Sequence, residues 1–261
     1  GPWKVGVVGI FQPFADALKL FSKSTVKSLK RNYLIMSLRP IYFIFLSLIF
    51  LTFKPLWAWS IYSFTTLTLL FLYTLRVYAT LLSGWSSNSK FSLVGRMRRI
   101  AQSLSYEISL RLFTLIMIYL YSSLRVKFYL ELNFLFFNIW FTWHILLALA
   151  INLIIEANRT PFDMSECESE LVSGFNVEYG GLEFSLIFLG ENLILLFNCF
   201  FISMFICRRI ELRLIWLMII GIWVSIRGAY PRLRLDVIIK LCWVILVPLS
   251  LIFMRLRILF M

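Results

Sequence analysis

Long apolar runs dominate this chain and constrain its fold more than any other feature. Hydrophobic residues make up 61% of the 261 residues and charged residues only 15%, against about 25% charge in a soluble domain. A run of about 20 apolar residues is long enough to cross a bilayer as a helix. We therefore predict an all-α integral membrane protein with about seven transmembrane helices, near residues 34–53, 58–83, 106–124, 133–155, 182–207, 212–227 and 236–256.

The whole chain, 1–261, is predicted to form a single membrane domain. Its parts are an interfacial segment over 1–33, four helices over 34–155, an acidic loop over 156–181 and three helices over 182–261. In the first part, apolar side chains recur at helical spacing at Phe11, Phe14, Ala15, Leu18 and Phe21, with Asp16, Lys19 and Lys23 turned away. This pattern predicts an amphipathic helix on the membrane surface, and the alternative is a helix packed on neighbouring loops.

Lys and Arg are distributed unevenly over the connections. With seven spans, the connections 1–33, 84–105, 156–181 and 228–235 share one face, and that face carries more of the basic residues than the other. The positive-inside rule then places the acidic loop on the cytoplasm-like side, which is the matrix side if the membrane is mitochondrial. This topology explains the formal net charge of +13, so no nucleic-acid partner is needed. Four basic residues fall within spans: Arg39, Arg76, Arg111 and Lys240.

Carboxylates are concentrated between two apolar runs. Residues 156–183 hold seven of the thirteen acids, namely Glu156, Asp163, Glu166, Glu168, Glu170, Glu178 and Glu183. Carboxylates at the edge of a membrane are costly unless they are paired, hydrated or protonated. Glu166, Glu168 and Glu170 alternate and repel one another, so we expect this loop to respond to a change of charge nearby.

Three further observations concern carboxylates in or beside the spans. Glu107 has Arg111 at i+4, the favoured order for a helical ion pair, so a simple salt bridge competes with a role in charge transfer. Glu156 ends the fourth apolar run, where a helix-end carboxylate can be ordinary. Glu191 lies nine residues into its span, roughly 13 Å deep, and is predicted to face an internal hydrated path or to be protonated.

The sequence offers no clear metal ligands. The four cysteines, at 167, 199, 207 and 242, form no CxxC pair, and His144 is the only histidine. Neither an iron–sulfur cluster nor a zinc site can be built from that set alone, so we predict no metal site and no complete redox centre in this chain.

Four blocks of the sequence resemble a known family. They are GPWKVGVVGIFQPFADALKLF (1–21), SGWSSNSKFSLVGRMRRIAQSLSYEISL (83–110), EANRTPFDMSECESELVSGFNVEYGG (156–181) and IRGAYPRLRLDVIIKLCW (226–243). The blocks lie in family order over nearly the whole chain, and ESELVSGFNVEY is the most specific of them. With these blocks, the chain resembles membrane subunit 1 of respiratory complex I, the NADH:ubiquinone oxidoreductase subunit called NuoH in bacteria.

The resemblance implies a fold and an activity. The family has eight transmembrane helices, the first of which precedes the segment that opens here, so we expect this chain to lack it. A short gene, a separately supplied helix and an omitted segment are all open explanations. The family's subunit encloses a tunnel for ubiquinone, docks the redox arm and relays charge toward membrane proton pumps. Ubiquinone is thus the expected substrate, and iron–sulfur clusters and FMN belong to partner subunits.

The resemblance also implies site residues. Proton or charge transfer would involve Glu107, Glu156, Glu191, Asp16, Glu166, Glu168, Glu170 and Glu178. The quinone path would be lined by Arg159, Phe162, Arg98, Tyr106, Arg227 and Arg232. Since guanidinium pairs bidentately with carboxylates, the arginines could also fix the acidic loop against the other loops. Their alternative interpretation is that they set topology at helix ends. Glu183 is the one loop acid that the family pattern does not require.

Two other functional classes fit parts of this sequence. A secondary transporter would also carry intramembrane acids, but no internal repeat is visible, and a structural scaffold would explain the apolar surface without the acids. The expected partners are the quinone-site and terminal-cluster subunits of the redox arm, antiporter-like and small membrane subunits, and membrane lipids, in a hetero-oligomer. Richness in Phe, Ile and Leu favours a mitochondrial inner membrane over a bacterial plasma membrane.

Overall fold

Helices make up every regular element that the computed structural model describes, which covers residues 6, 9–23, 32–52, 64–121, 139–163, 176, 179–206 and 212–259. In chain order these elements are α1 (Gln12–Ser22), α2 (Tyr33–Thr52), α3 (Thr65–Ser86), α4 (Lys90–Tyr121), α6 (Ile139–Ala157), α8 (Gly181–Ile206), α9 (Leu212–Ala229), α10 (Leu235–Lys240), the π-helix η5 (Leu241–Leu246) and α11 (Val247–Leu259).

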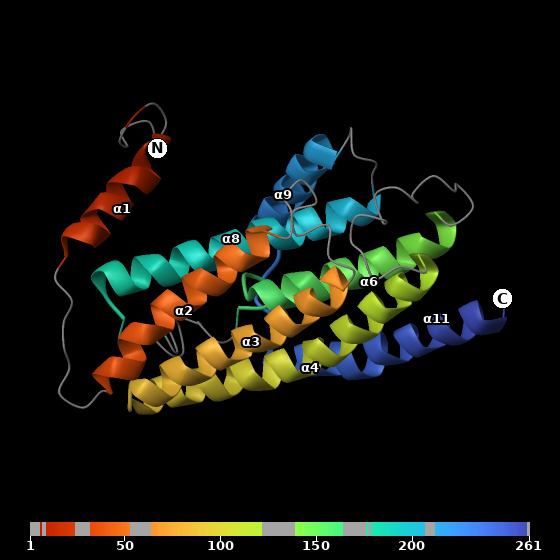
Figure 1. The fold of residues 1–261 in the computed structure, drawn as a ribbon, viewed down its shortest axis with the longest axis horizontal. Coiled ribbons are helices and arrows are strands. Elements are labelled where there is room, and N and C mark those ends of the chain that lie inside the picture. The colour runs from red at the N-terminus through yellow and green to blue at the C-terminus, as the bar shows by residue number, and fades with distance from the viewer. Residues whose placement is uncertain are drawn as a thin grey trace.

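A bundle of long helices forms the body of the protein. Helices α2, α3, α4, α6, α8 and α11 run along its long axis, and α9 crosses them steeply (Figure 1). The most extensive contact joins α2 to α8, and α3 packs between α2 and α4. Aromatic and aliphatic side chains such as Phe43, Phe113, Leu149 and Phe197 are almost fully buried in the centre. The core therefore lies between helices that are apolar along most of their length.

A glycine permits the close approach of α2 and α8. A Cβ atom built on Gly190 would lie 2.6 Å from a ring carbon of Phe43, far inside normal contact. Any other residue would push the two helices apart, because both belong to a tightly packed core. This contact matters for the site, since Gly190 precedes Glu191 and Phe43 packs over a buried arginine described below.

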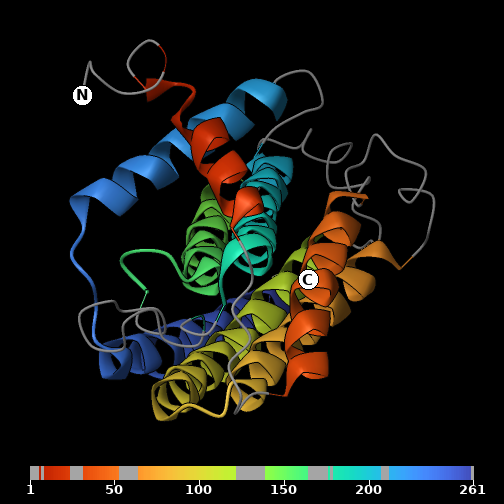
Figure 2. The same ribbon diagram turned by 90° about the vertical axis from the view of Figure 1, so that its left-hand side faces the viewer.

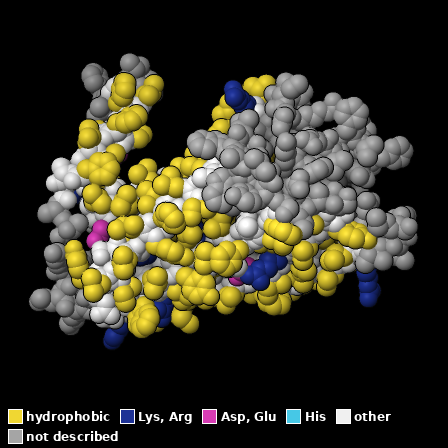
Figure 3. All heavy atoms as spheres, viewed as in Figure 1, with side chains coloured by type: hydrophobic (Ala, Val, Ile, Leu, Met, Phe, Trp, Pro, Cys, Tyr) yellow, Lys and Arg dark blue, Asp and Glu magenta, His cyan; other side chains and the backbone are white. Residues whose placement is uncertain are grey.

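The prediction of an all-α membrane protein is confirmed. Each of the seven predicted spans overlaps a helix. By length and apolar composition, four helices in the described part of the chain are suited to cross a membrane: Tyr33–Thr52, Thr65–Ser86, Gly181–Ile206 and Leu235–Arg255. Among the described side chains on the face seen in Figure 3, most are hydrophobic and few are charged. Such a surface suits a lipid environment.

One predicted connection is wrong. The predicted spans leave 84–105 as a connection, but α4 begins at Lys90 and runs without interruption to Tyr121. Hydropathy measures preference for lipid, whereas helix formation depends on backbone propensity and packing. The polar half of α4 is helical because its polar face is buried inside the protein, with Ser92, Gln102 and Ser105 hardly exposed. Glu107 therefore lies in the middle of α4 and not at the start of a helix, as the predicted span 106–124 implied.

The last predicted span is a composite of three segments. Helix α10, the π-helix η5 and α11 follow one another without a break. Pro248, the second residue of α11, has no N–H to donate to the carbonyl of Val244, so the hydrogen-bond pattern must change near this point. A hydropathy pattern carries no signal for such a change.

The N-terminal helix lies at one end of the bundle, at the left in Figure 1 and in front of α8 in Figure 2. No residue of α1 is buried, and Phe14 and Leu18 are 67% and 69% exposed. Its contact with the bundle is at α8, where Gly181 adopts a φ of +54° and a Cβ would meet the Lys23 carbonyl oxygen at 3.0 Å. The predicted amphipathic helix is present, and its apolar face is free to meet a membrane surface.

Candidate functional site

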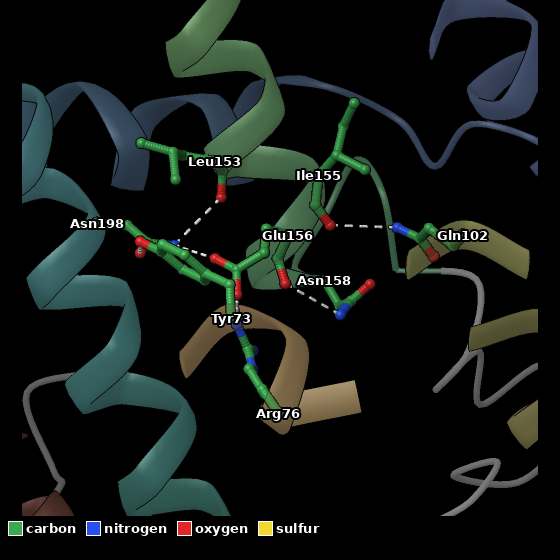
Figure 4. Close-up of polar contacts among 8 residues, drawn as sticks. All are labelled: Tyr73, Arg76, Gln102, Leu153, Ile155, Glu156, Asn158 and Asn198. Carbon is green, nitrogen blue, oxygen red and sulfur yellow. Dashed lines mark hydrogen bonds and ion pairs between the residues drawn. The ribbon is translucent and has the colours of Figure 1, made fainter. Parts of the chain in front are cut away.

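A buried set of polar side chains lies at the centre of the bundle, where α3, α6 and α8 meet (Figure 4). We call Tyr73, Arg76, Glu156 and Asn198 the buried node. Glu156 is fully buried, and its two carboxylate oxygens have different partners. Oε1 forms an ion pair with the Arg76 guanidinium, and Oε2 accepts a hydrogen bond from the Asn198 side-chain amide. Glu156 is therefore no ordinary helix-end carboxylate.

A tyrosine fixes the orientation of the Asn198 amide. The Tyr73 hydroxyl donates a hydrogen bond of 2.9 Å to Asn198 Oδ1, which leaves Asn198 Nδ2 to face Glu156. The same Nδ2 lies 3.5 Å from the Leu153 carbonyl oxygen. The members of the buried node thus form one connected set of contacts, from Tyr73 through Asn198 and Glu156 to Arg76. Because buried polar groups must be paired, the four side chains are fixed relative to one another.

The segment after α6 is held against α4. Gln102 donates from Nε2 to the carbonyl oxygens of Ile155, at 3.2 Å, and Phe162, at 3.1 Å. The side chains of Gln102 and Phe162 are buried. This double contact places the motif NRTPFD directly beside the buried face of α4, although the two segments are far apart in the sequence.

Arg159 and Glu191 form the second ion pair of the site. Arg159 Nη2 lies 2.9 Å from Glu191 Oε2, and the side chains are 15% and 14% exposed. The Arg159 guanidinium also lies over the Phe188 ring, 5.3 Å from its centroid. Glu191 was predicted to face a hydrated path or to be protonated. The structure instead gives it a charged partner from the neighbouring loop, so its carboxylate is not left unpaired within α8.

The motifs NRTPFD and IRGAYPR meet next to this pair. Leu233 N–H donates to the Pro161 carbonyl oxygen at 2.9 Å, and the Thr160 hydroxyl donates to the Arg227 carbonyl oxygen at 3.2 Å. As a result, Asp163 interacts electrostatically with Arg232, Arg159 and Glu191. Together with Arg227, which interacts with Asp163 and Arg159, these residues form what we call the charged cluster: Arg159, Asp163, Glu191, Arg227 and Arg232.

Asp163 is the most unusual member of the charged cluster. Its Oδ1 atom is buried without a hydrogen-bond partner in the described part of the chain. Burial raises the pKa of the Asp163 carboxyl above its ordinary value, and Glu191 raises it further, while Arg232, Arg159 and Arg99 oppose the rise. A carboxyl group that has a raised pKa and lies beside other charged side chains is a candidate for proton exchange.

Electrostatic interactions connect the buried node to the other carboxylates. Arg76 interacts with both Glu156 and Glu191, and the neutral side chain of Tyr106, which is 4% exposed, lies near both Glu156 and Glu107. Arg76 therefore connects two of the three predicted carboxylates, and Tyr106 lies near the third.

Glu107 and Arg111 form the ion pair that the i+4 spacing indicates. The two side chains are 16% and 50% exposed. The simple salt bridge is thus present on the surface of α4. Arg98, also predicted for the quinone path, lies on the same helix before Glu107 and is partly buried.

Of the remaining predicted carboxylates, only Asp16 lies in the part of the chain that the structure describes, and it is not brought into this site. Asp16 is exposed on α1 and accepts a hydrogen bond from Gln12 at 3.1 Å; no contact within the described residues joins it to the charged cluster. Glu166, Glu168, Glu170 and Glu178 lie outside the described residues. No group of three or more His, Cys, Asp and Glu side chains suited to a metal ion occurs in the part of the chain that the structure describes.

Several residues of the site escaped the sequence reasoning. Arg39, 1% exposed on α2, donates to Asn176 Oδ1 at 3.0 Å and lies 4.9 Å from the centre of the Tyr179 ring, so it fixes the end of the acidic loop. The sequence assigns no role to Arg76, Tyr73, Asn198 and Gln102, and it indicates Asp163 only as one of the loop acids. The signal was present for Arg39 and Arg76, because an arginine within a span needs a partner. The sequence gave no indication of which partner.

Comparison with known proteins identifies the family. The model of the family described as NADH dehydrogenase matches residues 1–258. NADH-ubiquinone oxidoreductase chain 1 of Anopheles gambiae is 42% identical over 260 residues, covering 96% of this chain and 82% of the relative. The same chain of Artemia franciscana is 38% identical over 261 residues, covering 97% and 85%, and that of Paracentrotus lividus is 38% identical over 271 residues, covering 96% and 81%. With matches of this extent and identity, the chain belongs to the NADH dehydrogenase family, among the proteins named NADH-ubiquinone oxidoreductase chain 1.

Proposed function

We propose that this chain encloses the ubiquinone access path of a proton-pumping NADH:ubiquinone oxidoreductase and relays charge from quinone reduction toward membrane proton pumps. Family membership makes it a membrane subunit of an NADH:ubiquinone oxidoreductase, a hetero-oligomeric enzyme in which ubiquinone takes part. One observation carries the finer proposal: the charged cluster lies next to the buried node. Arg76 interacts both with Glu191, which is partly exposed, and with Glu156, which is fully buried.

The charged cluster supplies what a quinone headgroup needs. Quinone oxygens accept hydrogen bonds, and Arg159, Arg227 and Arg232 offer permanently charged donors. The aromatic side chains of Phe162 and Tyr106 are buried beside this region, 7% and 4% exposed, and suit an apolar ring and tail. In the proposal, Arg98 completes this set from α4.

The carboxylates supply the relay. Reduction of a quinone to a quinol takes up protons, which leaves nearby acids with a changed charge. In the proposal, Asp163 and Glu191 sense this change at the charged cluster, and Glu156 and Glu107 pass it along through Arg76 and Tyr106. Asp16 and the loop acids Glu166, Glu168, Glu170 and Glu178 are proposed to extend the relay where the chain meets its partners.

The assembly and location follow the same proposal. The chain would dock the quinone-site and terminal-cluster subunits of the redox arm, which hold the iron–sulfur clusters and FMN, and would contact antiporter-like membrane subunits and lipids. We place it in the mitochondrial inner membrane, with the acidic loop on the matrix side.

Glu191→Gln in the assembled enzyme tests the relay. Removing the exchangeable charge is expected to lower the number of protons pumped per electron, while electrons still reach the quinone. The matched control is Glu183→Gln, because Glu183 lies two turns earlier on α8 and has no role in the proposal. Unchanged coupling in Glu191→Gln would contradict the relay, and an equal loss in both variants would indicate a general effect on α8.

Arg159→Ala tests the quinone path. Loss of one charge-assisted contact, about 1.5 kcal/mol, should raise the KM for a short-chain quinone roughly tenfold and change inhibitor sensitivity. Arg213→Ala serves as the control, because Arg213 is exposed near the opposite end of α9 from Arg227. If both quinone reductase rate and inhibitor sensitivity stay as they were, Arg159 does not line the path.

A further inference from the structure

The two ion pairs of the site differ in how completely they are enclosed. Arg76 and Glu156 are 3% and 0% exposed, whereas Arg159 and Glu191 are 15% and 14% exposed. Both carboxylate oxygens of Glu156 have partners, Arg76 and Asn198. For Glu191, one oxygen is paired with Arg159. A proton can reach Glu191 with a small rearrangement, but it reaches Glu156 only by breaking the buried node.

The Arg76 guanidinium is enclosed from several sides. The Phe43 ring of α2 lies 5.8 Å from its central carbon, Glu156 comes from α6, and Tyr106 from α4 interacts with it electrostatically. On the remaining side of the carboxylate, Asn198 donates a hydrogen bond to Glu156, and Tyr73 donates one to Asn198. Water exchange around the pair is therefore restricted, and its charges interact in a medium of low polarity.

Stability alone does not account for this pair. A buried ion pair is often no more stable than apolar residues of the same volume, and the Nε atom of Arg76 is buried without a hydrogen-bond partner among the residues that the structure describes. An incompletely satisfied guanidinium in a core costs free energy that Leu or Met would not cost. What Arg76 adds, and an apolar residue does not, is a permanent positive charge beside Glu156.

We propose that Arg76 is a positioning residue, a fixed counter-ion that keeps Glu156 negatively charged throughout the reaction cycle. Glu156 then acts through its field and does not carry a proton, whereas Glu191 exchanges protons. This inference rests on the proposed function in that it divides the work among the carboxylates of the relay. In this inference, the buried pair of Arg76 and Glu156 provides a fixed electric field, and the partly exposed pair of Arg159 and Glu191 exchanges protons.

In the described part of the chain, four helices surround Glu156, and three of them bring polar or titratable side chains toward it. Helix α3 contributes Tyr73 and Arg76, α4 contributes Tyr106, and α2 contributes the apolar Phe43. Helix α8 contributes the neutral Asn198, with Glu191 acting on Arg76. Arg76 is thus the only permanent positive charge that the described residues place in direct contact with Glu156.

Infrared difference spectroscopy of the assembled enzyme, recorded on quinone reduction over a range of pH, tests the proposal. The carbonyl stretch of a protonated carboxylic acid reports each carboxyl group that gains or loses a proton. The native enzyme and Glu156→Gln should give the same signal in this region, since Glu156 stays ionised. A signal that Glu156→Gln removes from the native spectrum would overturn the proposal. This comparison does not depend on any Arg76 variant.

Arg76 variants sharpen the test. In Arg76→Leu, a carboxylic-acid signal should appear that is lost again in Arg76→Leu with Glu156→Gln, and the pH profile of quinone reduction should gain an inflection. Arg76→Lys keeps the charge and should show neither change. An assembled Arg76→Leu enzyme with the native spectrum and pH profile would overturn the proposal. If Arg76→Leu does not assemble, the comparison of native enzyme with Glu156→Gln decides alone.

The failure of the proposed function is distinguishable from the failure of this inference. If Glu191→Gln pumps normally while Glu156 remains ionised in every state, the relay is wrong but the role of Arg76 stands. If Glu191→Gln uncouples the enzyme and Glu156 nevertheless changes protonation, the relay stands and the counter-ion role of Arg76 is wrong.

Discussion

Two Glu–Arg pairs in this chain have the same chemistry and opposite surroundings. Glu107 and Arg111 lie four residues apart on one helix, with 16% and 50% of their side chains exposed. Glu156 and Arg76 come from different helices, 80 residues apart, and are 0% and 3% exposed. The comparison teaches that the pairing of two charges says little about their role until their burial is known.

Burial changes the free energy of such a pair in two ways. An exposed pair is screened by water and contributes only about 0.2–1 kcal/mol. A buried pair costs a large desolvation energy and gains a strong attraction, so removing one partner leaves an uncompensated charge in the core. The surface pair can therefore be lost at little cost, whereas the buried pair must be kept or removed as a unit.

The largest expected effect comes from breaking the buried pair on one side. Arg76→Leu should lower the free energy of unfolding by about 3–5 kcal/mol, because Glu156 loses its counter-ion and must either stay charged in the core or take up a proton. Arg111→Leu, the matched change in the exposed pair, should lower it by at most about 0.5 kcal/mol. Thermal unfolding of the assembled enzyme, with the amount assembled as a second readout, measures both.

A double replacement separates pairing from packing in the same experiment. Arg76→Leu combined with Glu156→Leu removes both charges and should regain most of the loss. If the double variant is as unstable as the single one, the effect of Arg76→Leu comes from lost volume or strain, and the contrast between the two pairs is not electrostatic.

A smaller effect is expected from the tyrosine that orients Asn198. Tyr73→Phe leaves the buried Asn198 Oδ1 without its donor and should cost about 1–3 kcal/mol of unfolding free energy. Tyr42→Phe is the control, because the Tyr42 hydroxyl is partly exposed and donates at 3.3 Å to a helix carbonyl, that of Leu75. Unfolding of each variant is compared with the native enzyme. Equal effects would mean that the buried node does not depend on Tyr73.

The smallest effect concerns pH and the charged cluster. Burial raises the pKa of Asp163 above its ordinary value of 3.8. The stability that this raised pKa confers is fully present below the ordinary value and is lost as pH rises through the raised pKa. Asp163→Asn lacks this dependence, so its unfolding temperature relative to the native enzyme should increase with pH over that window.

The control for this pH dependence is Asp236→Asn. Asp236 is exposed in the first turn of α10, so the difference between that variant and the native enzyme should stay nearly constant with pH. A constant difference for Asp163→Asn as well would show that the Asp163 carboxyl is not destabilised by its burial.

Most of the fold could be predicted from the sequence. Apolar runs mark where helices can exist in lipid, so the predicted spans overlap α2, α3, α6, α8 and α9 within a few residues at most ends. The start of α4 at Lys90 could not be predicted this way, because its polar face is buried against protein. The i+4 spacing identified the pair of Glu107 and Arg111, since both partners are on one helix.

Less of the site could be predicted. The family motifs indicated Arg159, Glu191 and Glu156, and the structure brings all three close to the buried node and the charged cluster. Arg76 was visible only as an arginine within a span. Its partner lies on another helix, and sequence periodicity describes one helix at a time.

The sequence by itself determined that this is a helical membrane protein with acids and arginines concentrated in a few motifs, because hydropathy and local spacing depend on neighbouring residues alone. Only the tertiary structure decided which charge faces which. The packing of α2 against α3 and α8, and of α6 against α4 and α8, encloses Arg76 with Glu156 and leaves Arg159 with Glu191 at a partly open edge. Burial, which sets the strength of each pair, is a property of helices brought together and not of any one segment.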